Sequence, residues 1–236
     1  MKKILITSML VVGSAVAFAD IDHAQFVNMP GGGTGAIAGA NLSMLEAGEG
    51  TFGYGVQLGS NNVMADDFTV GAGGFNVTGI SVFSYVTGAT APTVTAASYK
   101  IDAAPTIASG LTVGTGIVTT MTGIYRVNAG DTGSTGGLRQ IQRVFIPVSM
   151  LLGAGTHFLS FADSGNFSPP LPTSLAVYGK NAQQSIANGA FAPVVNGTVG
   201  GADMGFIIHG DAVPEPATMA ALGLGVAALL RRRRSK

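Results

Sequence analysis

Few side chains in this sequence could carry acid–base, nucleophilic or metal chemistry. The chain has no Cys, which excludes disulfides, thiolate metal sites and a Cys nucleophile. Its three histidines, His23, His157 and His209, never stand four residues apart as a helical metal-binding pair would. His157 and His209 fall in segments that we predict as strands, where a hydrogen-bonded histidine is the ordinary case. The catalytic alternative is a Ser–His–Asp arrangement with Asp66 or Asp163, and no motif favours it.

Two adjacent carboxylates, Asp66 and Asp67, open a strand-like segment. Neighbours on a strand point to opposite faces, so this pair cannot act on one glycosidic bond. We expect both to accept hydrogen bonds from local backbone amides. The alternative is a calcium site that joins Asp66 or Asp67 to Asp203 and loop carbonyls, because Ca²⁺ prefers oxygen ligands. Apart from that candidate we predict no metal, no cofactor and no catalytic residue, and therefore no enzyme.

Glycine-rich motifs do not indicate a nucleotide site. Gly48, Gly50 and Gly53 match G-x-G-x-x-G, but a chain with 36 Gly among 236 residues gives about one such match by chance. No helical pattern follows it. Neither the phosphate-binding G-x-x-x-x-G-K-[ST] nor the hydrolase G-x-S-x-G occurs.

The charges are distributed unevenly along the chain. Seven of the 12 basic residues lie at the two ends, which leaves five against eleven acidic residues between positions 20 and 211. A segment with a net charge of about −6 cannot form the basic surface that follows a phosphate backbone. Nucleic acid is therefore excluded as a partner.

The N-terminus has the pattern of a secretory signal peptide. Two lysines follow the first Met, an apolar stretch runs over Ile4–Val12, and Ala17 and Ala19 form an A-x-A cleavage site. We predict cleavage by signal peptidase before Asp20, after delivery by the export machinery.

The C-terminus has the pattern of a tether. The sequence Pro214-Glu215-Pro216 precedes an uncharged stretch, Ala217–Leu230, and then four arginines, Arg231, Arg232, Arg233 and Arg234. The stretch is short for a membrane span, but arginine side chains can extend to the lipid surface and complete a thin one. The arginines would act as a stop-transfer signal and stay in the cytoplasm. We predict a transmembrane helix here.

This order of motif, small-residue apolar helix and basic end resembles the PEP-CTERM sorting signal of exported proteins in Gram-negative bacteria. The resemblance implies an exosortase as partner and assigns recognition to Pro214, Glu215 and Pro216. Two prolines around one residue also keep the segment extended and non-helical, as a processing enzyme requires.

The middle of the chain has the pattern of an all-β domain, with short β-rich runs between Gly, Asn, Asp and Pro clusters. The predicted strands begin near Ala65 and continue at Val77–Val86, Thr93–Ile101, Leu111–Met121, Ile124–Val127, Gln140–Val148, His157–Phe161, Ser174–Tyr178, Ala190–Val195 and Met204–His209. Val77–Val86 is apolar on both faces and should be central. Pro147 should mark an edge or a bulge. The one candidate helix is Gly39–Glu46, which could equally be a loop.

We therefore predict an all-β fold, a single β-sandwich of jelly-roll or immunoglobulin-like type, flanked by a signal-peptide helix and a C-terminal hydrophobic helix. The segments are a signal peptide at 1–19, a Gly-rich arm or first sheet edge at 20–62, the sandwich at 63–210, a linker with the PEP motif at 211–216, and the transmembrane helix with its cytoplasmic end at 217–236.

The functional hypothesis is an exported protein whose precursor is anchored in the membrane and then delivered to the cell surface or extracellular matrix. Its body would have a structural or interaction role. The alternative is a carbohydrate-binding module for extracellular polysaccharide, with or without calcium, in which Phe167 of the loop Asp163–Pro172 contacts a sugar. Phe167 could equally plug the end of the sandwich.

Overall fold

A computed structural model describes residues 20–128, 130, 139–175, 179, 181–214 and the single positions 223, 225 and 231. The predicted signal peptide and most of the predicted transmembrane helix lie outside these residues, as do Glu215, Pro216 and part of the strand predicted at 174–178.

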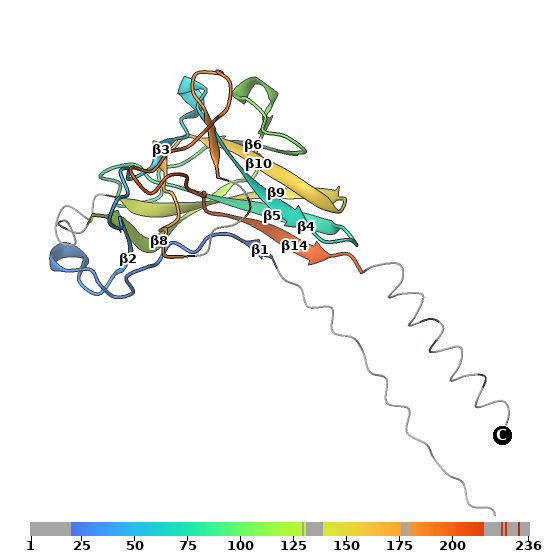
Figure 1. Cartoon of the computed structure of the whole chain (residues 1–236), viewed down its shortest axis with the longest axis horizontal. Helices are drawn as coiled ribbons and strands as arrows, with labels where there is room; N and C mark the ends of the chain where they lie inside the picture. The colour runs from blue at the N-terminus through green and yellow to red at the C-terminus, as the bar shows by residue number, and fades with distance from the viewer. Residues whose placement is uncertain are drawn as a thin grey trace, which may run out of the picture.

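The described chain consists mainly of strands, which confirms the all-β prediction (Figure 1). The strands are β1 Ile21–Asp22, β2 Asn41–Met44, β3 Tyr54–Gly55, β4 Val63–Val70, β5 Phe75–Ser84, β6 Ala97–Asp102, β7 Thr112–Val113, β8 Val118–Val127, β9 Gln140–Leu152, β10 Gly155–Asp163, β11 Phe167–Ser168, β12 Gln183–Ser185, β13 Ala192–Pro193 and β14 Phe206–Ala212. Three single-turn 3₁₀ helices, η1 Gly35–Ile37, η2 Leu58–Ser60 and η3 Ala108–Gly110, lie in the connections.

Two six-stranded sheets carry the described fold. One has the strand order β1-β14-β5-β9-β8-β2, and the other has the order β13-β12-β4-β10-β6-β7. Strands β3 and β11 pair separately. Neighbouring strands run antiparallel throughout, except that β2 and β8 are parallel. The apolar strand β5 is central, as its two apolar faces predicted.

One core cluster joins side chains from both sheets. Phe68 of β4 and Phe161 of β10 belong to the same cluster as Ile80 of β5 and Phe206 of β14. The rings of Phe68 and Phe206 meet edge to face with their centres 5.8 Å apart. The two sheets therefore share an apolar interior. The jelly-roll or immunoglobulin-like type of sandwich stays a prediction.

A bulge in β5 changes which residues face this interior. The register with β9 shifts between Val77 and Gly79, where Gly79 lies opposite Pro147. Between the pairs Gly79–His209 and Val77–Gly210, β5 has one residue more than β14. This extra residue reverses the alternation, so Val77 and Ile80, three positions apart, both pack in the core. Pro147 thus stands beside a bulge, as predicted, although β9 itself is central.

The N-terminal segment closes the outer face of the first sheet. Phe26 packs against Phe83, Ile141 and Leu171 in a second apolar cluster, and its ring lies 4.9 Å from that of Phe83. Figure 1 shows this blue segment running from β1 to β2. Beyond it, the prediction of a helix over Gly39–Glu46 is wrong, because Asn41–Met44 pair with β8 as strand β2.

Candidate functional site

The C-terminal segment leaves the fold directly from a sheet strand. The last residue of β14, Ala212, pairs with Phe75 of β5, and the amide of Val213 donates to the carbonyl of Gly74 at 2.9 Å. Pro214 follows and is exposed. The linker predicted at 211–216 therefore begins too early. Its first two residues belong to β14, because their backbone groups complete the ladder with β5.

The N-terminal end of the described chain lies on the neighbouring strand. Ile21 and Asp22 pair antiparallel with Ile208 and Ile207, so β1 starts where β14 approaches its end. His209 Nδ1 donates to Asp20 Oδ2 at 2.6 Å, and the amide of Gly210 donates to Asp20 Oδ1 at 3.2 Å. The predicted signal-peptide cleavage point, before Asp20, and the start of the predicted sorting motif, Pro214, thus lie at the same end of the sheet.

A chain of polar contacts continues behind Asp20. His209 Nε2 lies 2.9 Å from Ser81 Oγ and 3.1 Å from Arg143 Nη2. Arg143 Nε also donates to Ser81 Oγ at 2.8 Å. Because a guanidinium only donates, Nε2 accepts, and His209 carries its proton on Nδ1. We refer to Asp20, His209, Ser81 and Arg143 as the terminal clasp.

The terminal clasp contains the residue types of a hydrolytic triad, but a substrate could not reach its serine. Ser81 has no exposed surface, and Arg143 competes with its hydroxyl for the same histidine nitrogen. A nucleophile must reach a substrate carbonyl, so this geometry favours a structural role. The sequence-based alternative had paired a histidine with Asp66 or Asp163, whereas His209 binds Asp20. No local signal reveals the clasp, because its members are brought together by strand register.

A β-bulge at Gly210 lies near the C-terminal end of β14. The register with β5 shifts between His209 and Gly210, and Gly210 has φ of 152°. A Cβ built there would lie 1.9 Å from the carbonyl oxygen of Asn76.

We expect Gly210→Ala to lower the free energy of unfolding by about 1–3 kcal/mol, because alanine must leave this backbone conformation or displace β5. Denaturant unfolding would measure the loss. Gly153→Ala is the matched control, since a Cβ there meets nothing within 4 Å. Equal stability of the two variants would contradict the assignment of strain to Gly210.

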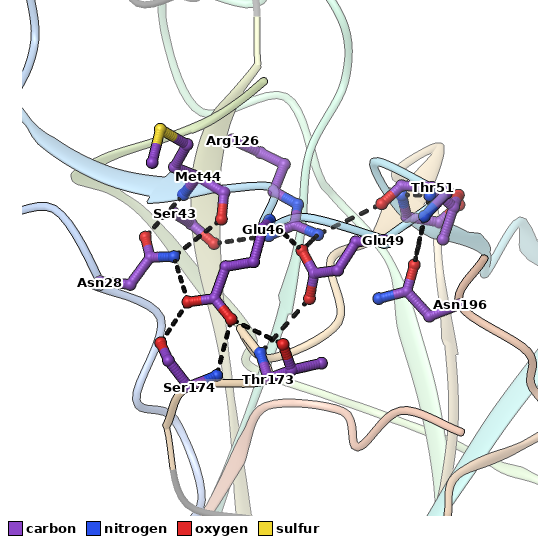
Figure 2. Close-up of polar contacts among 12 residues, drawn as sticks. Asn28, Ser43, Met44, Glu46, Glu49, Thr51, Arg126, Thr173, Ser174 and Asn196 are labelled. Atoms are coloured by element: carbon purple, nitrogen blue, oxygen red, sulfur yellow. Dashed lines mark hydrogen bonds and ion pairs between the residues drawn. The ribbon is translucent and has the colours of Figure 1, made fainter. Parts of the chain in front are cut away.

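A buried ion pair, drawn in Figure 2, lies at β8, towards the edge of the first sheet that is away from β1 and β14. Arg126 of β8 and Glu49 have fully buried side chains, and Arg126 Nη2 lies 3.5 Å from Glu49 Oε2. Arg126 also donates to Ser43 Oγ at 3.1 Å and to the carbonyl of Thr51 at 3.2 Å. Burial lowers the pKa of Arg126, and the negative charge of Glu49 opposes that change. Glu49, within the glycine-rich motif at 48–53, thus places its carboxylate beside the buried guanidinium of Arg126.

Glu46 extends this network to a distant loop, as Figure 2 shows. Its carboxylate accepts hydrogen bonds from Asn28 Nδ2 at 2.9 Å, from Thr173 Oγ1 at 2.6 Å, and from the amide and hydroxyl of Ser174. Burial alone would raise the pKa of Glu46, but these donors lower it to about 2. Both Glu46 and Glu49 therefore act as acceptors that fasten loops together.

Two of the predicted calcium candidates, Asp66 and Asp203, lie close enough for the charge of one to act on the other, but the hydrogen bonds of Asp66 are made to backbone amides. Asp66 accepts the amides of Asp67 at 2.9 Å and of Met204 at 2.7 Å, which confirms the expected backbone role of Asp66. Burial, opposed by these amides, raises its pKa to about 9, and the charge of Asp203 adds to the rise. Across the described ranges, no group of three or more His, Asp or Glu side chains is arranged to hold a metal ion. Calcium binding stays a prediction.

The remaining candidates lie apart. His157 Nε2 donates to the carbonyl of Gly153 at 2.9 Å, the hydrogen-bonded strand role predicted for it. Asp163 is fully buried, and burial raises its pKa to about 6. Phe167 is 36% exposed, and its ring centre lies 5.7 Å from that of Tyr85. Asp203 borders a small cavity of about 50 Å³, whose other lining residues are Leu171, Pro172, Thr173, Asn181, Gly201 and Ala202.

Comparison with known proteins identifies one feature. Residues 212–234 match the PEP-CTERM protein-sorting motif. No curated protein matches the chain. No solved structure matches it either.

The matched region begins at the final residue of β14, exactly one residue before the backbone bond to Gly74. Within the part of the chain that the structure describes, no helix has the length and apolar character needed to cross a bilayer. The motif implies export and a membrane-anchored precursor. The chain carries a PEP-CTERM sorting motif, which implies processing by an exosortase.

Proposed function

We propose that this chain is a non-catalytic surface or matrix protein, held at the membrane by residues 217–236 until an exosortase cuts near Pro214–Pro216. The match of residues 212–234 to the sorting motif carries this proposal. The processed body would then reach the cell surface or the extracellular matrix.

The polar side chains of the body support the non-catalytic part of the proposal. Ser81 has no exposed surface, and Asp66 and Asp163 are buried. Glu46 and Glu49 are occupied by hydrogen bonds that fasten loops. Groups held in this way stabilise a scaffold and are not available to a substrate. Carbohydrate binding stays a prediction, because Phe167 packs on Tyr85 and no described contact favours a sugar.

We expect Glu215→Gln and Pro214→Ala to leave a longer precursor in the membrane fraction, because the exosortase would lose its recognition residues. The measurement is the mass of the C-terminus and the fractionation of the chain in cells with and without the exosortase. The matched control is Asp211→Asn, which makes the same kind of change outside residues 212–234. Release of the Glu215→Gln and Pro214→Ala variants at the wild-type mass would contradict the proposal.

A further inference from the structure

Two tight turns and the departing C-terminal segment share one end of the body. Residues 71–74 connect β4 to β5, and residues 153–154 connect β9 to β10. Pairing of Phe75 with Leu152 and of Val70 with Gly155 places the turns side by side. Val213 binds Gly74 in the first turn. We call residues 71–74, 153–154 and 213 the exit end.

The exit end is small and uncharged. Its turns contain only Gly and Ala, in the sequences Gly71-Ala72-Gly73-Gly74 and Gly153-Ala154. A Cβ on Gly74 would lie 2.7 Å from the carbonyl oxygen of Leu152, so the first turn packs against the end of β9 with no room for a side chain at Gly74. Beside them Leu151 is 69% exposed. Such a surface can approach lipid without burying a charge or displacing long side chains.

The sorting motif gives the exit end a short tether. Val213 is fixed to Gly74, and the uncharged stretch begins at Ala217. Four fully extended steps span at most about 14 Å. The interfacial layer on one side of a bilayer is roughly 5–8 Å thick. With the apolar stretch in the membrane, the exit end cannot leave the neighbourhood of the lipid headgroups.

The position of the N-terminal end of the body supports the same orientation. Asp20 lies on the same end through its bonds to His209 and Gly210. A signal peptide ahead of Asp20 would enter the same membrane, so both membrane-directed segments leave the body in one place. The two carboxylate oxygens of Asp20 already accept hydrogen bonds from His209 and from the amide of Gly210, so neither oxygen needs a new partner near the lipid headgroups.

We propose that the exit end is the membrane-facing surface of the precursor and rests against phospholipid headgroups while the tail is anchored. This inference depends on the proposed function, because it requires residues 217–236 to lie in the membrane. The opposite end of the body, marked by Ser60 before the start of β4, would point away from the bilayer.

Single cysteines can test this orientation, since the chain has none of its own. Ala72→Cys and Ala154→Cys place an exposed label on each turn of the exit end, and Ser60→Cys is the control at the other end. The full-length precursor would be reconstituted in vesicles of phosphatidylethanolamine and phosphatidylglycerol with spin-labelled headgroups. We expect fluorescence quenching several-fold stronger at positions 72 and 154 than at 60.

Equal quenching at all three positions in a precursor that floats with the vesicles and is cut by exosortase would overturn this inference alone. Failure of the wild-type precursor to float would show that residues 217–236 do not anchor it, and this result would contradict the proposed function as well. Wild-type melting temperatures of the labelled variants establish that each label reports on the folded body. Two independent positions on the exit end keep the test decisive if one variant misfolds.

Discussion

Replacing Arg126 by Met is expected to lower the free energy of unfolding by about 3–5 kcal/mol, because it leaves a buried carboxylate without its cation. The side chains of Arg126 and Glu49 are both fully buried, so water cannot replace the lost partner. The same substitution removes the hydrogen bonds to Ser43 and Thr51. Denaturant unfolding of the variant and the wild type would measure the loss.

Arg139→Met is the matched control for this prediction. Its guanidinium carbon lies 3.8 Å from the ring centre of Phe52, a cation–π contact that is worth about 0.5–1 kcal/mol at partly exposed sites. We therefore expect a much smaller loss than for Arg126→Met.

The double variant Arg126→Met with Glu49→Leu separates the ion pair from the loop contacts. We expect the double variant to lose less free energy of unfolding than the two single variants lose together, because neither charge is then left buried without its partner. Recovery would be incomplete, since Glu49 also accepts the amides of Glu46 at 2.8 Å and Thr173 at 3.3 Å. Strictly additive losses would show that the two side chains do not act as a pair.

Two buried carboxyl groups should make the stability of the body depend on pH. Burial raises the pKa of Asp66 to about 9 and that of Asp163 to about 6, from an ordinary value of 3.8. The folded chain therefore holds these protons after the unfolded chain has released them. Each group contributes stability that is complete below its unfolded pKa and is lost as the pH rises through its folded pKa.

We expect Asp66→Asn to gain stability relative to the wild type as the pH rises from about 4 to 9, by about 1.4 kcal/mol per pH unit. Asp163→Asn should show the same slope only between about 4 and 6 and then a constant difference. Asparagine has nearly the shape of the protonated acid and cannot ionise. Differences between variant and wild type isolate each group from His23, whose pKa burial lowers.

Asp102→Asn is the control for the pH series, because Asp102 is exposed on β6. Unfolding midpoints in urea across the series give the required free energies. A difference for Asp66→Asn that does not change over pH 4–9 would show that this carboxyl ionises normally in the fold.

The environment of Asp163 explains why its proton is retained. Asp163 Oδ1 accepts the amide of Gly165 at 2.6 Å. Within the described residues its Oδ2 atom and the Ser84 hydroxyl are buried without a well-formed hydrogen bond, although the hydroxyl is near enough to lower the pKa. Desolvation exceeds these effects, since no described cation pairs with the carboxyl.

Local sequence was sufficient for several of the long strands and for the sorting motif. Alternation and turn residues placed β5, β9 and β10 within a few positions of their observed bounds. Pro214, Glu215 and Pro216 are recognised by their order before an apolar stretch and a basic end, which needs no partner elsewhere in the fold. Such patterns are local because side-chain alternation and turn propensity act over a few residues.

The helix predicted at Gly39–Glu46 shows where local patterns are insufficient. Its residues Asn41–Met44 form β2 because β8, some 80 residues later in the chain, offers a free edge for parallel pairing. The linker predicted from 211 likewise begins inside β14, since β5 supplies the partner groups. An edge strand depends on a neighbour that its own residues do not specify.

The sequence by itself determined the exported class, the strand-rich body and the sorting motif. Only the tertiary structure decided that Glu49 meets Arg126 and that Asp20 meets His209 and Ser81. It also decided that the sorting motif leaves the body without an intervening linker. The physical reason is that these contacts depend on strand register and bulges, which are set by packing of the whole core and not by the residues on either side.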